Sequence, residues 1–292
     1  MSRRIAGLLL AATALALVIA GVAGASSAST KLQKVPSIAK QVPAKIRGKG
    51  TLVVASDATY APMESIAKDG HTVIGVDPDL AKDLGTVLGL KFKVENASFD
   101  GIIPGLHSGK YDIGMSSFTP TKAREKVVDF VTYFSAGVSF YVKSSGGPTI
   151  TNLGSLCGHS VAVENGTTEQ TEAQAQNTKC KKAGKKGVSV KAYPDQNTAN
   201  LAISSGREQV GMADSEVVAY IVKQSQGQFK IVGKSYAFAP YGIALPKNNG
   251  MAKPMLAAVK YLMKQGAYAK VLKKWGVQSG AISNPRINGA TS

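Results

Sequence analysis

Short apolar runs alternate with amphipathic segments between about residue 50 and residue 277. Buried strands are expected over Thr51–Ala55, Tyr111–Met115 and Ser160–Val163, because each is a brief run rich in apolar or small residues beside polar or turn-forming ones. Asp77–Leu88 begins on Asp with Pro second and carries Leu and Ala at helical spacing, which predicts a capped helix. The alternation predicts an α/β fold with a largely parallel sheet.

The same pattern predicts the remaining elements. Strands are expected over Lys91–Glu95, Gly137–Val142, Val188–Tyr193, Gln209–Met212 and Tyr241–Leu245, and helices over Phe99–His107, Gly166–Gln176 (a loop and a polar helix), Gln196–Ser204, Ser215–Gln224 and Lys253–Trp275, the last interrupted near Gly266. Ser144–Pro148 is a clear break, which divides two sets of α/β segments.

The N-terminal region has the pattern of an export signal. Arg3 and Arg4 precede an unbroken run of small and apolar residues that ends in Ala23-Gly24-Ala25. This order predicts a signal peptide over residues 1–25, cleaved after about Ala25, and therefore an exported protein. An uncleaved membrane anchor is the alternative, since the run is long enough to span a bilayer. Residues 26–49 are rich in Ser, Ala and Lys, and predict a basic linker.

Length and composition are those of a soluble protein of two medium domains, with 292 residues, 44% hydrophobic and 18% charged. The formal net charge is +17, and it falls to +15 without Arg3 and Arg4. The basic residues gather in separate places, in Lys31–Lys49, Lys179–Lys186 and Lys253–Lys274, and the first two contain no aromatic residues. Attraction to an anionic cell-surface polymer or membrane is therefore favoured over nucleic-acid binding.

Two cysteines, Cys157 and Cys180, are the only ones in the chain. In an oxidising compartment an even pair favours a disulfide, and closing a loop of this length would stabilise the fold by roughly 3–4 kcal/mol. The three histidines are His71, His107 and His159, and neither they nor the cysteines have metal-ligand spacing. No metal or cofactor is expected.

A candidate anion site lies within Gly109–Phe130. An apolar run, Ile113–Met115, breaks into Ser116, Ser117, Phe118, Thr119 and Pro120, and a helical turn carrying Arg124 follows. Strand ends and helix starts in α/β folds present unpaired backbone N–H groups to small anions. The guanidinium of Arg124 can add a bidentate grip on a carboxylate. The alternative is a surface arginine that follows a loop.

Four sequence segments resemble one known family, the polar amino-acid-binding proteins of ABC importers. The segments are FDGIIPGLHSGKYD (Phe99–Asp112), MSSFTPTKAREKVVDF (Met115–Phe130), GVDPDLAKDL (Gly75–Leu84) and YGIALPKNNG with QGAYAKVLKKWGV (within Tyr241–Val277). The resemblance covers about residues 50–277, and the segments occur in the family's order.

This resemblance implies a two-lobed, periplasmic-binding-protein-like fold, with a two-strand hinge and a ligand cleft between the lobes. Residues 50–142 and 242–278 would form the first lobe, and residues 143–241 the second. The chain would cross between lobes near residues 141–145 and return near residues 239–242. Residues 279–292 would form a C-terminal tail.

The resemblance also implies the contacts of a zwitterion. Arg124 falls where the family holds the α-carboxylate, and Asp214 falls where an acid pairs with the α-ammonium. Further carboxylate contacts are implied for Ser116, Ser117 and Thr119 beside Arg124, and for Gly166, Thr167 and Thr168 at a helix start across the hinge. Spacing alone leaves Asp214 an alternative role, as the N-cap of the helix over Ser215–Gln224.

Four more positions match those that surround the ligand's side chain in relatives: Asp57, Tyr60, Asp77 and Phe99. Two aromatic rings could enclose a long side chain, and two acids nearby favour Lys, Arg, ornithine or His as ligand. Core packing is the alternative for Tyr60 and Phe99, and helix capping is the alternative for Asp77.

We therefore expect a monomeric substrate-binding protein of an ABC transporter. It would capture a polar L-amino acid, with basic ones favoured, outside the membrane and deliver it to the transporter's membrane subunits by closing its lobes. No catalytic residues are expected, because G-x-S-x-G, P-loop and HExxH motifs are absent from the sequence. Two alternatives stay open: a cyclohexadienyl-dehydratase-like enzyme on the same fold, and a ligand sensor that acts on a membrane partner.

Overall fold

The computed structural model describes residues 32–290 of the chain. The predicted signal peptide and the first residues of the predicted linker lie outside this range. Among the residues described, no helix combines the length and the apolar character that crossing a membrane requires.

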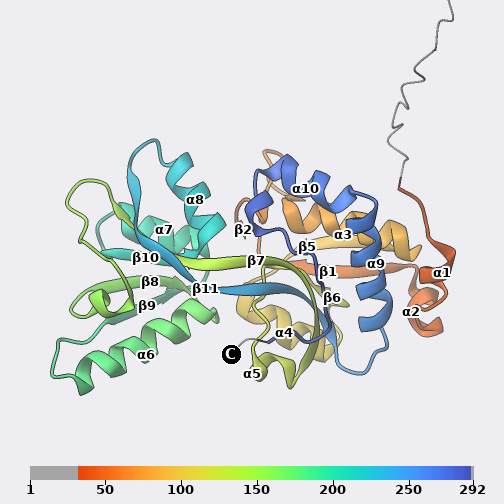
Figure 1. The fold of residues 1–292 in the computed structure, drawn as a ribbon, viewed down its shortest axis with the longest axis horizontal. Coiled ribbons are helices and arrows are strands. Elements are labelled where there is room, and N and C mark those ends of the chain that lie inside the picture. The colour runs from red at the N-terminus through yellow and green to blue at the C-terminus, as the bar shows by residue number, and fades with distance from the viewer. Residues whose placement is uncertain (1–31, 291–292) are drawn as a thin grey trace, which may run out of the picture. The chain divides into compact units, whose positions relative to one another are not determined.

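An eight-stranded sheet forms the centre of the fold (Figure 1), in the order β5-β1-β6-β11-β7-β10-β8-β9. Its strands are β1 (Thr51–Ser56), β5 (Lys91–Asn96), β6 (Ile113–Gly114), β7 (Val128–Lys143), β8 (Ser160–Glu164), β9 (Ser189–Tyr193), β10 (Val210–Asp214) and β11 (Phe229–Pro246). Strands β1, β5 and β6 pair in parallel, as do β8, β9 and β10, as the sequence predicts. A small antiparallel sheet contains β2 (Thr59–Tyr60), β3 (Glu64–Ile66) and β4 (Val73–Ile74).

Strands β7 and β11 belong to both lobes. The C-terminal part of β11 pairs with the first half of β7 and, at one position, with β6, whereas the second half of β7 pairs with β10 and with the start of β11. The antiparallel register between β7 and β11 shifts around Tyr236–Ala239. The pairing partners of β7 therefore change near Gly137, and the predicted crossings at residues 141–145 and 239–242 stay predictions.

The first lobe packs helices on both faces of its half of the sheet. They are α3 (Val76–Leu88), α4 (Phe99–Ser108), α5 (Lys122–Glu125), α9 (Ala252–Lys264) and α10 (Ala267–Trp275). The break predicted near Gly266 is confirmed, since this glycine is left-handed (φ 75°) between α9 and α10. Leucines at helical spacing in α3, including Leu80, Leu84 and Leu88, are fully buried in the core.

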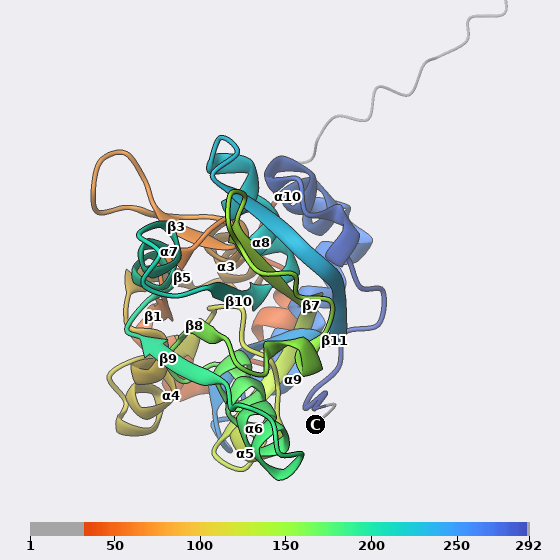
Figure 2. The same ribbon diagram turned by 90° about the vertical axis from the view of Figure 1, so that its left-hand side faces the viewer.

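The second lobe contains α6 (Thr168–Lys182), α7 (Gln196–Ser204), α8 (Ser215–Gln224) and the short 3₁₀ helix η1 (Leu153–Leu156). Figure 2 shows α6 on one side of β8–β10 and α7 and α8 on the other. Its apolar core includes Val161, Val163 and Met212 from the strands and Ala173 from α6. Helix α6 extends through Lys182, six residues beyond the predicted end at Gln176, and includes the start of the basic cluster over Lys179–Lys186.

The predicted disulfide is confirmed. Cys157, which follows η1, bonds to Cys180 of α6, and their Cα atoms are 5.7 Å apart. Cys180 is buried in the second-lobe core, so the bond ties η1 to α6.

The expected basic linker over residues 26–49 is wrong for the part that the structure describes. Two short helices, α1 (Pro36–Ala39) and α2 (Ala44–Lys49), form here. Ile38 and Val42 are buried in the first-lobe core, and the Val35 N–H donates to the Val87 carbonyl at 3.0 Å. The segment is basic, but its apolar side chains are enough to dock it.

The predicted C-terminal tail is also ordered in its described part. After the 3₁₀ helix η2 (Gln278–Gly280), residues 281–290 run beside the first half of β7, with isolated bridges from Ala281 to Phe134 and from Ile287 to Val131. The tail is therefore a packed part of the first lobe.

Candidate ligand-binding site

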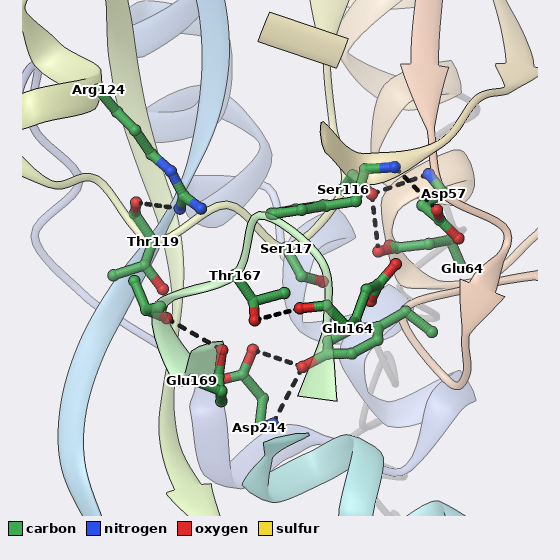
Figure 3. Close-up of a pocket in the computed structure, with 13 residues that line it drawn as sticks. Asp57, Glu64, Ser116, Ser117, Thr119, Arg124, Glu164, Thr167, Glu169 and Asp214 are labelled. Carbon is green, nitrogen blue, oxygen red and sulfur yellow. Dashed lines mark hydrogen bonds between the residues drawn. The ribbon is translucent and has the colours of Figure 1, made fainter. Parts of the chain in front are cut away.

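A pocket lies between the two lobes (Figure 3). Its walls come from loops and strand ends of both lobes, as expected for a site at the carboxyl ends of parallel strands. It is lined by Asp57, Tyr60, Glu64, Phe99, Ser116, Ser117, Thr119, Arg124, Glu164, Thr167, Thr168, Glu169 and Asp214. Ten of the twelve predicted ligand-binding residues are among them, and Asp77 and Gly166 are not.

Asp57 follows β1 and is held by its neighbours. The backbone N–H of Phe99 donates to its Oδ2 at 2.9 Å, and Thr59 Oγ1 donates to its Oδ1 at 2.6 Å. Burial raises the pKa of this carboxyl, and these hydrogen bonds partly offset the effect. Asp57 therefore presents a fixed carboxyl group at the pocket wall.

Ser116 and Ser117 follow β6 and connect the pocket to buried acids. Ser116 Oγ accepts from the Asp57 N–H at 2.8 Å and donates to Glu64 Oε1 at 3.3 Å. Ser117 is left-handed (φ 51°), a conformation that is uncommon for a residue with a side chain. Its N–H donates to Asp77 Oδ2 at 3.1 Å.

Asp77 lies behind the pocket and does not line it, in contrast to the predicted position beside the ligand's side chain. Its carboxyl accepts from Ser117 N–H and from Tyr133 Oη at 2.6 Å, and it is 1% exposed. The alternative of helix capping is also wrong, since Gly75 is the N-cap of α3 and no side chain caps that end. Asp77 therefore fixes the strained Ser117.

Arg124 reaches the pocket from α5. Nη1 donates to the Thr119 carbonyl at 2.8 Å, and Nη2 donates across the lobes to the Gly166 carbonyl at 2.9 Å. The guanidinium lies 5.3 Å from the ring centroid of Phe99, which stacks on Phe118 at 4.6 Å. Burial lowers its pKa, and the charges of Glu169 and Asp214 oppose this. A guanidinium has five N–H donors, so three remain for a ligand.

The Gly166–Thr168 loop starts α6 on the opposite lobe. Thr167 caps the helix, since its Oγ1 accepts from the Gln170 N–H at 3.2 Å and donates to the Glu164 carbonyl at 2.7 Å. Thr167 and Thr168 line the pocket as predicted. Gly166 does not, because its N–H donates to Gln170 Oε1 at 2.8 Å and its carbonyl faces Arg124. It lines instead a neighbouring groove that also contains Lys122, Ala136 and Phe238.

Asp214 ends β10 and stands at the N-cap position of α8, but its side chain makes no capping bond. Instead, Tyr60 Oη donates to its Oδ2 at 3.1 Å and accepts from its backbone N–H at 3.0 Å. Burial and the charge of Glu169 raise its pKa well above the ordinary value. Asp214 therefore occupies the N-cap position of α8 with its backbone, while its carboxyl group lines the pocket.

Three buried acids that sequence reasoning missed also line the pocket: Glu64, Glu164 and Glu169. Within residues 32–290, Glu64 Oε2, Glu164 Oε1 and Glu169 Oε1 have no hydrogen-bond partner. Burial raises the pKa of each carboxyl, and nearby acids add to this for Glu64 and Glu164. The sequence carries a usable signal for Glu164, since an acid ends a largely apolar strand two residues before the Gly-Thr-Thr loop.

The charges are arranged along the pocket. In Figure 3, Arg124 lies at one end, Asp57 and Glu64 at the other, and Glu169 and Asp214 along the second-lobe side. Five carboxyl groups face one guanidinium, so the pocket is complementary to a molecule with more positive than negative groups. No cluster of His, Cys, Asp or Glu suited to a metal ion occurs in the described part of the chain.

Comparison with known proteins gives a family match over most of the chain. The model of the bacterial extracellular solute-binding proteins, family 3, matches residues 52–278. The arginine-binding protein ArgT of Corynebacterium glutamicum is 31% identical over 255 residues, which is 87% of this chain and 83% of ArgT.

Solved structures show the same fold. An ancestral arginine-binding protein bound to arginine superposes with a TM-score of 0.71 at 37% identity, over 77% of this chain and 98% of that one. An ancestral amino-acid-binding protein described as a precursor of cyclohexadienyl dehydratase gives a TM-score of 0.71 at 33% identity, over 79% and 97%. The predicted two-lobed, periplasmic-binding-protein-like fold is thereby confirmed.

Proposed function

Since the chain belongs to the bacterial extracellular solute-binding proteins of family 3, we propose that it captures a free L-amino acid with a cationic side chain for an ABC importer. The observation that carries the choice of a cationic ligand is the set of five carboxyl groups around one guanidinium. Three of these acids keep a buried oxygen without a partner among the described residues. A buried unpartnered carboxyl oxygen is unfavourable, and a ligand's N–H groups would remove this cost.

The order of charges along the pocket suits one orientation of the ligand. The α-carboxylate binds at Arg124, where three N–H donors are free and Thr119 lies alongside. The α-ammonium binds at Asp214, with Glu169 adjacent. A long side chain then extends past Phe99 and ends among Asp57, Glu64 and Glu164. An arginine, lysine or ornithine side chain has the required length and charge.

Binding is coupled to closure of the lobes. Arg124 belongs to the first lobe and Asp214 to the second, so only a closed arrangement satisfies both ends of the zwitterion. Hydrogen bonds already join the lobes at the pocket rim, from Gln196 N–H to Thr59 Oγ1 at 3.2 Å and from Asn165 Nδ2 to Asp100 Oδ2 at 2.7 Å. The ligand adds contacts that the open form lacks, and the membrane subunits of the importer recognise the closed form.

Export and a monomeric state complete the proposal. The N-terminal signal pattern supports export.

Lysines at the end of α6 and in the following turn are exposed, including Lys181, Lys185 and Lys186, and an anionic cell-surface polymer is proposed as their partner. Salt-dependent binding to anionic liposomes tests this, and binding that is insensitive to salt contradicts it.

A binding protein without turnover is favoured over a cyclohexadienyl dehydratase. The structural neighbour that is described as a precursor of such an enzyme is the reason to test this alternative. Prephenate and arogenate each carry two carboxylates, and a pocket with five carboxyl groups and one guanidinium opposes a second negative charge. Incubation with either compound should therefore give no product.

Calorimetric titration with single L-amino acids tests the proposed ligand class. We expect arginine, lysine, ornithine or histidine to bind at least about a hundredfold more tightly than glutamine, because a buried ion pair lost to a neutral side chain costs roughly 3 kcal/mol or more. Preferential binding of glutamine, glutamate or cystine overturns the cationic assignment. No binding of any amino acid overturns the proposed function itself.

A further inference from the structure

Residues 281–290, called here the C-terminal strap, lie beyond the part of the chain that matches the family. The strap is anchored to the first half of β7 by backbone contacts. Thr132 N–H donates to the Arg286 carbonyl at 2.9 Å, and Asn288 N–H donates to the Phe130 carbonyl at 2.9 Å. Phe130 N–H in turn donates to Asn288 Oδ1 at 2.9 Å. These paired bonds make the strap an additional, irregular strand.

The strap covers a strand edge that is otherwise free. In the first lobe β7 pairs with β11 on one side, and β10 reaches β7 only from Val138 to Tyr141. The other side of β7 before Gly137 therefore has no neighbouring strand of the main sheet. An uncovered edge of this kind leaves N–H and C=O groups unpaired. The strap pairs part of it.

The end of the strap reaches the helical turn that carries Arg124. Ala290 N–H donates to Glu125 Oε1 at 2.8 Å, and Asn288 Nδ2 donates to Asp129 Oδ1 at 3.1 Å. Glu125 is the last residue of α5 and the direct neighbour of Arg124. The strap thus links β7 to α5.

Helix α5 needs such support, because it has little of its own. It is four residues long, has no buried residue, and is capped by the Thr121 hydroxyl, which accepts from Arg124 N–H at 3.1 Å. A single isolated turn is unstable in water, so contacts from outside determine its position. The Ala290–Glu125 bond is one of these contacts.

We propose that the C-terminal strap holds α5 in place and thereby positions Arg124 for the ligand carboxylate, with Glu125 as the positioning residue. This inference rests on the proposed binding of an amino acid. Glu125 is not among the residues that line the pocket, so its effect passes through the backbone of α5.

Paired substitutions at Glu125 test the proposal on the full chain. Glu125→Ala removes the acceptor for Ala290 N–H, and we expect L-arginine to bind about five- to tenfold more weakly by calorimetry. Glu125→Gln keeps an acceptor oxygen and should restore most of the affinity. Asn284→Ala is the matched control within the strap, since Asn284 is exposed and makes no side-chain hydrogen bond in the described structure. It should bind like the wild type.

A role through Arg124 predicts two further results. In an Arg124→Ala background, Glu125→Ala should cause no additional loss of L-arginine affinity. In the ligand-free protein, Glu125→Ala should speed amide hydrogen exchange of residues 121–126 relative to Asn284→Ala. A chain ending at Gly280 should show the same exchange pattern.

The outcomes separate this inference from the proposed function. If the wild type binds no amino acid, the proposed function fails, and the exchange measurement still tests the strap. If the wild type binds L-arginine and Glu125→Ala binds it equally well, the positioning role is overturned. Equal losses in Glu125→Ala and Glu125→Gln also overturn it, since the acceptor oxygen is then irrelevant.

Discussion

Tyr60 and Asp214 are joined twice across the cleft. The Tyr60 hydroxyl donates to the Asp214 carboxyl at 3.1 Å and accepts from the Asp214 backbone N–H at 3.0 Å. Tyr60 belongs to the first lobe and Asp214 to the second, and both are buried. The pair therefore holds the lobes together and orients the carboxyl proposed to bind the α-ammonium.

Replacing Tyr60 tests this link. Tyr60→Phe removes both hydrogen bonds, so the closed form should be less populated and L-arginine should bind about tenfold more weakly. X-ray scattering should show a larger radius of gyration for the ligand-free variant than for the wild type. Tyr193→Phe is the control, because Tyr193 bonds to Glu208 within the second lobe. If Tyr60→Phe has the affinity and the radius of gyration of the wild type, the Tyr60–Asp214 hydrogen bonds do not hold the lobes together.

Arg124→Ala tests the carboxylate site. We expect affinity for the amino acid to fall a hundredfold or more, since the charge-assisted hydrogen bonds are worth roughly 3 kcal/mol or more together. The free energy of unfolding of the ligand-free protein should change by less than about 1 kcal/mol. Lys122→Ala, on the exposed side of the same turn, should leave affinity near that of the wild type. Equal affinity in Arg124→Ala by calorimetry would falsify the carboxylate role.

Glu164 tests the preference for a cationic side chain. Glu164→Gln keeps the shape and removes the carboxyl that would pair with the cationic end of the ligand, so affinity for L-arginine should fall about tenfold while affinity for L-glutamine stays the same or rises. Glu208→Gln is the matched control, because Glu208 is buried in the same lobe but does not line the pocket. A parallel loss for both ligands contradicts a charge-specific role.

The buried acids predict a pH dependence of stability. Burial and the charge of Asp77 raise the pKa of Glu64 well above 4.5, and burial raises that of Asp77 to about 6. The folded ligand-free protein therefore holds protons more tightly than the unfolded chain. Its stability should fall as pH rises through the raised pKa values, by about 1.4 kcal/mol per pH unit for each proton.

Glu64→Gln isolates this contribution. The variant should gain stability over the wild type from about pH 5 upward, because it lacks the carboxyl that must ionise. Denaturant titrations of both proteins across this range measure the difference. If the difference does not depend on pH, the Glu64 carboxyl does not titrate as inferred.

The disulfide should stabilise the fold without affecting the site. Cys157 and Cys180 are 23 positions apart, and a closed loop of this size contributes about 3 kcal/mol. The Cys157→Ser and Cys180→Ser double variant should lose about that much unfolding free energy. Its affinity for L-arginine should change less than about twofold, because neither cysteine lines the pocket. An unchanged denaturation midpoint in the double variant contradicts the stabilising role.

The sequence predicts the parts of the site that recur in a fixed local pattern. Arg124 and Asp214 fall at positions where the resemblance to the amino-acid-binding family implies ligand contacts, so the resemblance placed both at the pocket, whereas spacing alone left a surface arginine and an N-cap as alternatives. In the structure both residues line the pocket. Their roles as ligand contacts stay predictions.

The additional acids could not be placed in the same way. Glu169 in the first turn of α6 has the position of an ordinary dipole-stabilising residue, and Glu64 belongs to a three-residue strand with no visible periodicity. Only the tertiary arrangement shows that their side chains are buried around one space. Asp77 and Gly166 fall outside the pocket lining for the same reason, since neighbouring residues take up their polar groups.

The long strands were underestimated because their pairing partners change along their length. β11 begins at Phe229, far before the predicted Tyr241, and its first half is largely exposed. Such a segment has no clear hydrophobic alternation. Likewise, the docked residues 32–49 resemble a linker in composition, although Ile38, Ala39 and Val42 are buried.

The passage of β7 and β11 through both lobes has a consequence for how the protein is made. The first lobe needs the end of β11 together with α9 and α10, which follow the whole second lobe along the chain. The second lobe is contiguous between the crossings and can form its sheet earlier. During synthesis the second lobe can therefore complete its fold before the first lobe. The nascent first lobe stays incomplete until the end of β11, α9 and α10 have been made.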